Sequence, residues 1–482
     1  MLFNSIDFAI FLPIVFLLYW FVTDKNLKLQ NFLIVTASYV FYGWWDWRFL
    51  SLILFSTLVD YLVGVGLLKQ TNQSKRKILL WVSILVNLGF LAFFKYFNFF
   101  IDNFIAAFSF FGTEIQANSL NIILPVGISF YTFQTLSYSI DVYRRKIEPT
   151  RDFIAFAAFV SFFPQLVAGP IERATHLLPQ FYVKRTFDYS KAVDGMRQIL
   201  WGLFKKIVIA DQCAEYANQI FNHSDNYSGS TLILGALFFT FQIYGDFSGY
   251  SDIAIGTSRL FGFNLMQNFN FPYFSRDIAE FWRRWHISLS TWFRDYLYIP
   301  LGGSHGGMWM KVRNTFIIFI VSGFWHGANW TFIVWGTLNA IYFLPLLLTN
   351  SNRTHLGTIA EGRTIPNIKE LFQMILTFGL TVFAWIFFRA NDLDHAVRYL
   401  SEIFSNSLFT LPKFPGIETA YNLFFLVTFF IFMEWQGRSG QYAISNFALR
   451  WKRPVRYAFY YLIIAAIFWF GGKEQQFIYF QF

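Results

Sequence analysis

Apolar segments of up to about 20 residues recur along the whole chain, and they restrict its fold more than any other feature. The first four cover residues 6–22, 32–45, 49–68 and 78–94. A helix needs about 20 apolar residues to cross the hydrocarbon core of a bilayer. Only 14% of the residues are charged, whereas soluble domains carry about 25%. The pattern predicts an all-α, polytopic membrane helix bundle.

Basic residues gather in short loops between these segments. The loops at 24–30, 69–77 and 144–151 are rich in Lys and Arg, and such loops face the cytoplasm. The net charge of +10 is therefore explained by membrane topology and does not indicate nucleic-acid binding. The first residues are expected outside, and residues 6–22 are expected to be a retained first span rather than a signal peptide.

The rest of the chain continues the same pattern as one domain, 1–482, with about 10–12 embedded helices in total. Residues 98–119 are only partly apolar and predict a short or interfacial helix with an external loop. Residues 153–168 are interrupted by Pro164 and predict a re-entrant segment, which is tolerated only where it is buried in protein or lines a cavity. Residues 314–348 predict two helices broken near Gly327.

Several kinds of chemistry lack the residues they need. The single cysteine, Cys213, excludes an intramolecular disulfide and a multi-cysteine metal site. The sequence has no H-E-x-x-H motif, no close histidine pair, no G-x-S-x-G elbow and no P-loop. These absences argue against a zinc hydrolase, a serine hydrolase and a P-loop enzyme, and no metal ligands are predicted.

His326 lies within the apolar stretch 314–348. A titratable group at membrane depth is a candidate functional residue, although it can also simply bond a neighbouring helix. Ser322 and Asn329 lie four residues before and three after it, which would place both on its side of a continuous helix. Gly323 and Gly327 form a small-xxx-small pair that lets a helix or a ligand approach the backbone closely.

His286 lies in the segment 281–296, which mixes three arginines with three tryptophans. This composition is typical of an interfacial helix anchored by Trp and Arg. It also fits a re-entrant helix that lines a polar passage, with Arg283 and Arg284 available for phosphate or carboxylate groups. Trp285 precedes the histidine directly. The other histidines lie in polar segments and are expected to be solvated: His176, His223, His305, His355 and His395.

Two further polar clusters interrupt apolar stretches. Asp246 and Asp252 are six residues apart, about 240° around a helix, so they cannot act as a pair and each needs its own partner. Lys205 and Lys206 predict a helix near a membrane surface. What remains is a histidine base without a nucleophile of its own. It suits attack by a substrate hydroxyl on an activated acyl group, with the base accepting the proton.

The sequence resembles the membrane-bound O-acyltransferase family, and most closely its bacterial alginate O-acetyltransferase branch. The resemblance covers nearly the whole chain. Its segments are LFNS at 2–5, FYGWW at 41–45, FFPQLVAGPI at 162–171, GDFSGYSD at 245–252, FWRRWHISLSTWFRDY at 281–296, GFWHGA at 323–328 and FIYFQF at 477–482.

The resemblance implies that His326 is the catalytic histidine and that His286 occupies the second, more variable position of the family's site. It also implies a ring of helices around a central funnel or tunnel in the bacterial inner membrane. Acetyl would come from cytoplasmic acetyl-CoA, with no bound cofactor, and would reach a serine-hydrolase-like partner protein outside and then a polysaccharide. Arg283, Arg284, Trp285, Asp246 and Asn329 are expected to contribute to substrate binding.

Two alternatives remain. The first is an acyltransferase of the same fold with another donor or acceptor, such as D-alanyl transfer to teichoic acid. The second is a transporter or channel without chemistry, which would tolerate replacement of His326. The two embedded histidines and the absence of a visible inverted repeat favour an enzyme over a transporter.

Overall fold

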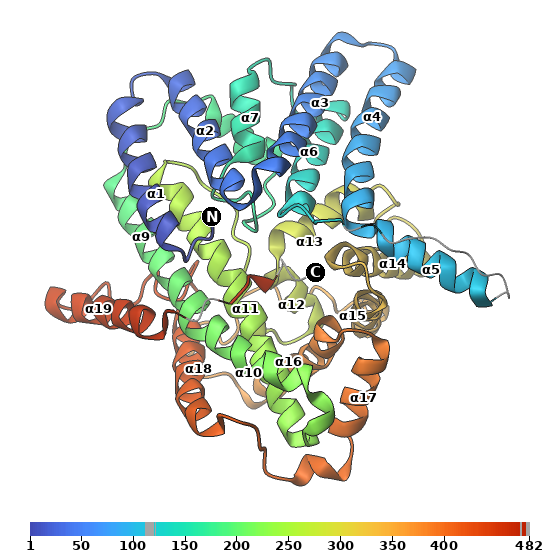
Figure 1. Ribbon diagram of the computed structural model, residues 1–482, viewed down its shortest axis with the longest axis vertical. Coiled ribbons are helices and arrows are strands. Elements are labelled where there is room, and N and C mark those ends of the chain that lie inside the picture. The colour runs from blue at the N-terminus through green and yellow to red at the C-terminus, as the bar shows by residue number, and fades with distance from the viewer. Residues whose placement is uncertain (111–119, 121, 473–474, 479–482) are drawn as a thin grey trace. The chain divides into compact units, whose positions relative to one another are not determined.

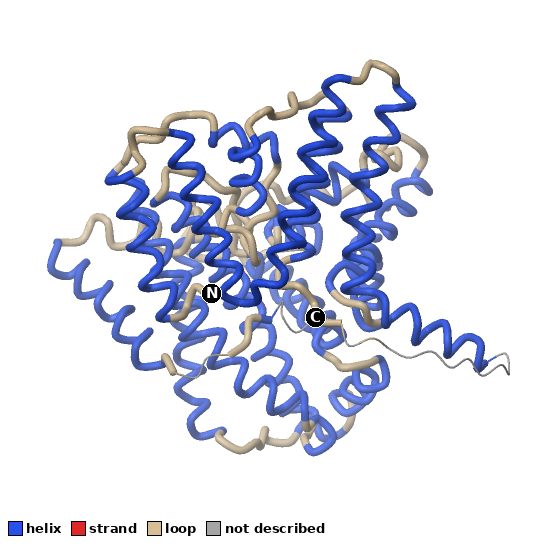
Figure 2. Tube along the Cα trace, turned by 45° about the horizontal axis from the view of Figure 1, so that its top comes forward, coloured by secondary structure: helices blue, strands red, loops and turns tan. Residues whose placement is uncertain are grey.

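Helices form all of the regular structure in the described part of the chain. The computed structural model describes residues 1–110, 120, 122–472 and 475–478, and these contain helices, turns and loops but no strand (Figures 1 and 2). The predicted all-α class is confirmed. Within these residues, six helical segments are long and apolar enough to cross a membrane: Leu27–Lys69, Gln73–Phe110, Gly229–Leu260, Trp330–Leu348, Ile368–Arg389 and Ile417–Gly437.

The chain divides into two compact units. The first comprises residues 1–192 and 257–266, and the second comprises residues 193–256 and 267–482. The helices of the first unit are α1 Ile6–Leu17, α2 Leu27–Asp46, α3 Leu50–Lys69, α4 Gln73–Leu91, α5 Phe97–Phe110, α6 Ile128–Tyr143, α7 Phe153–Ser161 and α8 Ala174–Leu177. Helix α6 packs against both α3 and α4, and α7 packs against α2.

A buried carboxylate ties three helices of the first unit together. Asp60 on α3 is fully buried and accepts hydrogen bonds from the side chains of Ser83 and Asn87 on α4 and from Ser139 on α6. A carboxylate in an apolar interior is costly unless such donors surround it. This polar centre therefore fixes the register of α3, α4 and α6.

Two expected irregular segments lie in this unit. Helix α7 ends at Ser161, and the following residues 162–170 form buried turns that contain Pro164. At nine residues, α7 is too short to cross a bilayer, which agrees with the predicted interruption. The predicted partly apolar helix forms as α5, while residues 111–119 of the expected external loop lie outside the described residues.

The second unit contains the rest of the helices. They are α9 Tyr189–Leu203, which begins in the first unit, α10 Asp211–Asn222, α11 Gly229–Leu260, whose last turn belongs to the first unit, α12 Ile278–Arg284, α13 Ile287–Phe293, α14 Met308–His326, α15 Trp330–Leu348, α16 Ile368–Arg389, α17 Leu393–Ile403, α18 Ile417–Gly437 and α19 Arg453–Phe470. A π-helical turn, Phe204–Ala210, joins α9 to α10, and a second, Arg294–Tyr298, continues α13.

The two lysines of the first π-helical turn are buried, so the prediction of a surface helix at this position is wrong. Lys205 pairs with Asp252 at 2.5 Å, and Lys206 pairs with Asp246 at 2.8 Å and with Asp211 at 2.7 Å. Burial acts to lower the pKa of Lys206, but Asp246 and Asp211 outweigh it and raise this pKa. Both aspartates of α11 thus have the separate partners that their spacing demands.

One histidine expected in solvent is also buried. His395, at the start of α17, is 6% exposed and lies 3.1 Å from the hydroxyl of Ser224. The side chain of Asp392, the N-cap of α17, accepts a hydrogen bond from the backbone NH of His395. The polar residues around His395 are those of a helix N-terminus, and they do not indicate that the histidine itself is exposed. His223 and His305, in contrast, are exposed as predicted.

Candidate active site

His326 is the last residue of α14 and is 4% exposed. The chain leaves the helix at Gly327, and α15 begins at Trp330 with Asn329 as its N-cap. The predicted break near Gly327 is confirmed. The expectation that Asn329 shares a helical face with His326 is wrong, because its side chain accepts from the NH of Thr331 and donates to the carbonyl of Asn391.

Aromatic rings surround the imidazole of His326. Their centroids lie 4.8 Å away for Trp325, 5.2 Å for Trp335 and 5.3 Å for Phe388. These rings come from α14, α15 and α16 respectively. They exclude water from three sides, and a hydrogen bond or a developing charge is felt more strongly in such a dry environment.

Two glycines allow α14 and α15 to touch along their backbones. A Cβ added to Gly323 would collide with the carbonyl oxygen of Phe332, and one added to Gly336 would collide with the carbonyl oxygen of Phe319. The close approach inferred from the small-xxx-small pattern is therefore made by α15 (Figure 1). It holds the end of α14, and with it His326, in a fixed position.

Replacing Gly323 with alanine should destabilise the protein by about 1–3 kcal/mol, the range for overpacking a tight contact. The reason is that the new methyl group meets backbone rather than a side chain that can turn away. Thermal unfolding in detergent measures the effect. Gly379→Ala on α16 is the matched control, because no atom lies within 4 Å of its added Cβ. Equal melting temperatures for the two variants would contradict the close contact.

His286 lies between two short helices and is 1% exposed. Its φ of 44° is left-handed, a conformation that a residue other than glycine adopts only where the surroundings hold it. It is the N-cap position of α13, which follows directly after α12 and Trp285. The turn between the two helices thus points the imidazole into the protein rather than along the helix surface.

Asn268 fixes the orientation of this ring. Its Oδ1 lies 3.1 Å from Nδ1 of His286 and accepts from the hydroxyl of Ser288 at 2.8 Å, while its Nδ2 donates to Ser251 at 3.0 Å. Because Oδ1 can only accept, the proton of His286 is assigned to Nδ1 and the lone pair to Nε2. His286 lies outside the helices long enough to span, and burial lowers its pKa from 6.5 to about 3. The ring is therefore neutral.

Trp325 brings the two histidines into one site. Its ring centroid lies 4.8 Å from that of His326 and 6.2 Å from that of His286. His286 also packs against Phe247 on α11, with the two rings perpendicular and their centroids 4.6 Å apart. The structure thus joins two histidines that are 40 residues apart in the sequence, through a single indole.

We expect Asn268→Ala to lower kcat about tenfold, because a buried polar group that loses its partner costs about 1–3 kcal/mol and 1.4 kcal/mol is a factor of ten. Steady-state acyl transfer by the purified protein measures kcat. Asn226→Ala, at an exposed position, is the control. A lower melting temperature with unchanged kcat would show that Asn268 supports the fold without positioning His286.

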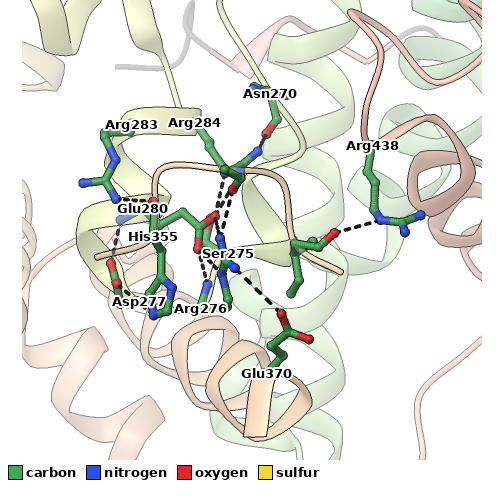
Figure 3. Close-up of polar contacts among 12 residues, drawn as sticks. Asn270, Ser275, Arg276, Asp277, Glu280, Arg283, Arg284, His355, Glu370 and Arg438 are labelled. Atoms are coloured by element: carbon green, nitrogen blue, oxygen red, sulfur yellow. Dashed lines mark hydrogen bonds and ion pairs between the residues drawn. The ribbon is translucent and has the colours of Figure 1, made fainter. Parts of the chain in front are cut away.

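The arginines proposed for substrate binding are engaged with protein groups. Arg284 forms an ion pair with Glu280 at 2.9 Å and donates a hydrogen bond to the carbonyl of Gly357 (Figure 3). Arg276 also pairs with Glu280 at 2.9 Å and donates to the same carbonyl. Arg283 donates to the carbonyls of Asn352 and His355. These bonds fasten the loop after α15 onto α12. Trp285 is 2% exposed and packs on Phe269 with centroids 5.1 Å apart.

Asp246 lies in the interior of α11, away from solvent. Besides Lys206, it accepts a hydrogen bond at 2.8 Å from the backbone NH of Ile478. Lys206 also donates to the carbonyl of Gln475. The charge pair therefore holds the segment 475–478 against the helix that carries Phe247, and this segment includes the first two residues of the closing sequence motif, Phe477 and Ile478. The last four residues of that motif, 479–482, lie outside the described residues.

Sequence reasoning missed the residues that define the surroundings of the two histidines. Asn268 begins the stretch 268–312, which is less apolar than the segments on either side of it. This position is the only feature of the sequence that could have indicated a role for Asn268. Trp335 and Phe388 occur within apolar spans rich in aromatic residues, so nothing in the local pattern distinguished them. Among the described residues, no group of three His, Cys, Asp or Glu side chains could hold a metal ion.

The arrangement offers a buried imidazole in a dry aromatic surround and a second, neutral imidazole beside it. A neutral imidazole can accept the proton of a hydroxyl as that hydroxyl attacks a carbonyl. Proteins of similar sequence belong to a family that catalyses acyl transfer to hydroxyl groups. Residues 79–388 match the profile of the membrane-bound O-acyltransferase family.

Three relatives are informative. The chain is 42% identical over 414 residues to a probable alginate O-acetylase of Azotobacter vinelandii, a match that covers 85% of this chain and 79% of the relative. A probable alginate O-acetylase of Pseudomonas aeruginosa is 41% identical, with 86% and 76% covered. The peptidoglycan O-acetyltransferase of Helicobacter pylori is 35% identical, with 83% and 79% covered. This multi-pass chain belongs to the membrane-bound O-acyltransferase family and is an O-acyltransferase.

Proposed function

We propose that the protein transfers an acetyl group from cytoplasmic acetyl-CoA to a hydroxyl acceptor on the other side of the bacterial inner membrane, for O-acetylation of an alginate-like exopolysaccharide. The observation that carries this proposal is the junction of His326 and His286 through Trp325 in a chain 42% identical to a probable alginate O-acetylase. The acceptor that we infer is a serine-hydrolase-like partner protein, which passes the acetyl group to the polysaccharide.

In this reaction His326 is the general base. Its imidazole accepts the proton of the acceptor hydroxyl while the hydroxyl oxygen forms a bond to the acetyl carbonyl carbon. The carbon–sulfur bond of the thioester then breaks, and CoA leaves as a thiol with the proton returned by the imidazole. His286, held neutral by burial and oriented by Asn268, positions the donor or the acceptor beside the base.

The test of the donor uses purified protein reconstituted into vesicles. Acetyl-CoA labelled in the acetyl group is added on one side, and labelled ester is measured on the periplasmic partner supplied on the other. We expect label on the partner with acetyl-CoA and none with labelled acetyl phosphate. Transfer of D-alanine from a thioester carrier, with no transfer from acetyl-CoA, would refute the proposal.

The acceptor has a second candidate, because one relative is named a peptidoglycan O-acetyltransferase and is 35% identical. The same assay separates the two candidates when the final glycan is varied. Acetyl ester on an alginate-like polymer supports the first. Ester that forms only on peptidoglycan fragments supports the second and leaves the donor and the role of His326 unchanged.

A further inference from the structure

A cavity of about 430 Å³ lies where α13 ends, α14 begins and α15 ends, and neither His286 nor His326 is among its lining residues. Three cationic side chains line it, and they come from three different segments. Arg294 lies on the π-helical turn after α13, Lys311 on the first turns of α14, and Arg353 in the loop after α15. No Asp or Glu is among its lining residues.

Two of these cations are not neutralised by acidic side chains. Arg294 shares the carboxylate of its neighbour Asp295 at 2.8 Å. Among the described residues, neither Lys311 nor Arg353 forms an ion pair. Hydroxyl groups of Ser290, Tyr298 and Ser304 line the cavity beside them. Cations with hydroxyl donors around them are the groups that bind phosphate oxygens.

Another part of the cavity lining is apolar. Ile318 and Phe319 follow Lys311 by two turns on α14, and Phe343 and Leu347 contribute to the lining from α15. Seven residues of helix rise about 10 Å, so the apolar wall lies that far along α14 from the cationic mouth. The cavity therefore suits a molecule with a phosphate at one end and an apolar body at the other.

The position of the cavity indicates which kind of molecule this is. Helix α15 is apolar and long enough to span a membrane, and it ends at Leu348, beside the cationic mouth. Leu348 and Ile341 on this helix are 52% and 47% exposed, and such apolar surface on a spanning helix faces lipid. Trp309, at the start of α14, is 79% exposed, and tryptophan is enriched at the level of the headgroups. The mouth thus lies at headgroup depth.

We propose that this cavity binds the phosphate of an acidic phospholipid, with the headgroup between Lys311 and Arg353 and an acyl chain along Phe319 and Phe343. Basic pockets between membrane helices recognise anionic headgroups in this way. A soluble phosphate ester such as CoA shares the phosphate chemistry but lacks an acyl chain long enough to follow the exposed flank of α15. The site is independent of the acetyl-transfer reaction.

The test measures lipid binding by native mass spectrometry of the purified protein with added phosphatidylglycerol or phosphatidylcholine. We expect retention of phosphatidylglycerol, and about 30-fold weaker binding in the double variant Lys311→Gln, Arg353→Gln, because each cation near a headgroup contributes about fivefold. Lys311→Arg should bind as the wild type does. Lys369→Gln, which removes an exposed cation at the start of α16, is the control.

Three outcomes would overturn the assignment. The first is unchanged phosphatidylglycerol binding in the double variant, and the second is equal retention of phosphatidylcholine. The third is displacement of phosphatidylglycerol by CoA or inorganic phosphate at millimolar concentration, which would identify a soluble phosphate ligand. Running the same measurement on His326→Ala separates this site from the reaction, since that variant should still bind phosphatidylglycerol.

Discussion

Replacing His326 with alanine is expected to lower the rate of acyl transfer by about 10²–10⁴-fold, the contribution of a positioned general base. The physical reason is the dry environment of the ring. Trp325, Trp335 and Phe388 enclose it, so water cannot readily take over the proton transfer. The measurement is kcat for transfer of labelled acetyl from acetyl-CoA by the reconstituted protein.

His223→Ala is the matched control for this variant, because His223 is exposed and lies at the end of α10, outside the candidate site. The control should retain wild-type kcat. Both variants should melt within a few degrees of the wild type, which excludes unfolding as the cause of lost activity. Full activity in a folded His326→Ala protein would remove the base from the mechanism and would favour transport without chemistry.

Asp252→Ala should destabilise the protein by about 3–5 kcal/mol, which is the cost of leaving a buried charge without its partner. Lys205 is only 3% exposed and pairs with Asp252 at 2.5 Å. The hydroxyl of Ser248 at 2.9 Å and the ring of Tyr244, whose centroid is 5.7 Å away, also contact its ammonium, but neither carries the negative charge that Asp252 supplies. The variant is expected to show a much lower melting temperature in detergent and a low yield of folded protein.

The double variant Lys205→Met, Asp252→Leu provides the control. It removes both charges and keeps the side-chain volumes close, and replacing a whole buried pair in this way is often neutral or stabilising. We expect it to recover most of the stability lost in Asp252→Ala. A double variant as unstable as the single one would mean that the lost stability arises from packing or from Gln198, which also bonds Asp252, rather than from an unpaired charge.

The large features of the fold follow from the sequence because they depend on local properties. Apolar stretches of helical length are visible in any short window. Gly327 marks the end of α14, because a glycine two residues before Asn329 favours a break followed by a new N-cap. The separate partners of Asp246 and Asp252 also follow from local geometry, since residues six apart point in different directions on a helix.

The errors arise where a partner lies far away in the chain. Lys205 and Lys206 have the composition of a surface helix. Asp211, five residues after Lys206, is one of the carboxylates that permit their burial, but the other two, Asp246 and Asp252, lie 40 and 47 residues later on α11. Asn329 lies beyond the end of α14, so a continuous helix from His326 predicts its position wrongly. The orientation of His286 depends on Asn268, 18 residues earlier, and the rings around His326 come from three helices. The pattern of apolar and polar residues within one segment cannot predict contacts with residues of other segments.

The backbone contact between α14 and α15 has a consequence for motion in this enzyme. Two helices that touch through Gly323 and Gly336 cannot slide past one another without opening that contact, so His326 behaves as a stationary reference point during a turnover. His286, by contrast, belongs to a turn between two helices of seven residues each, and the amide of Asn268 orients its ring. We therefore expect any rearrangement that admits a substrate to leave α14 and α15 paired and His326 in place.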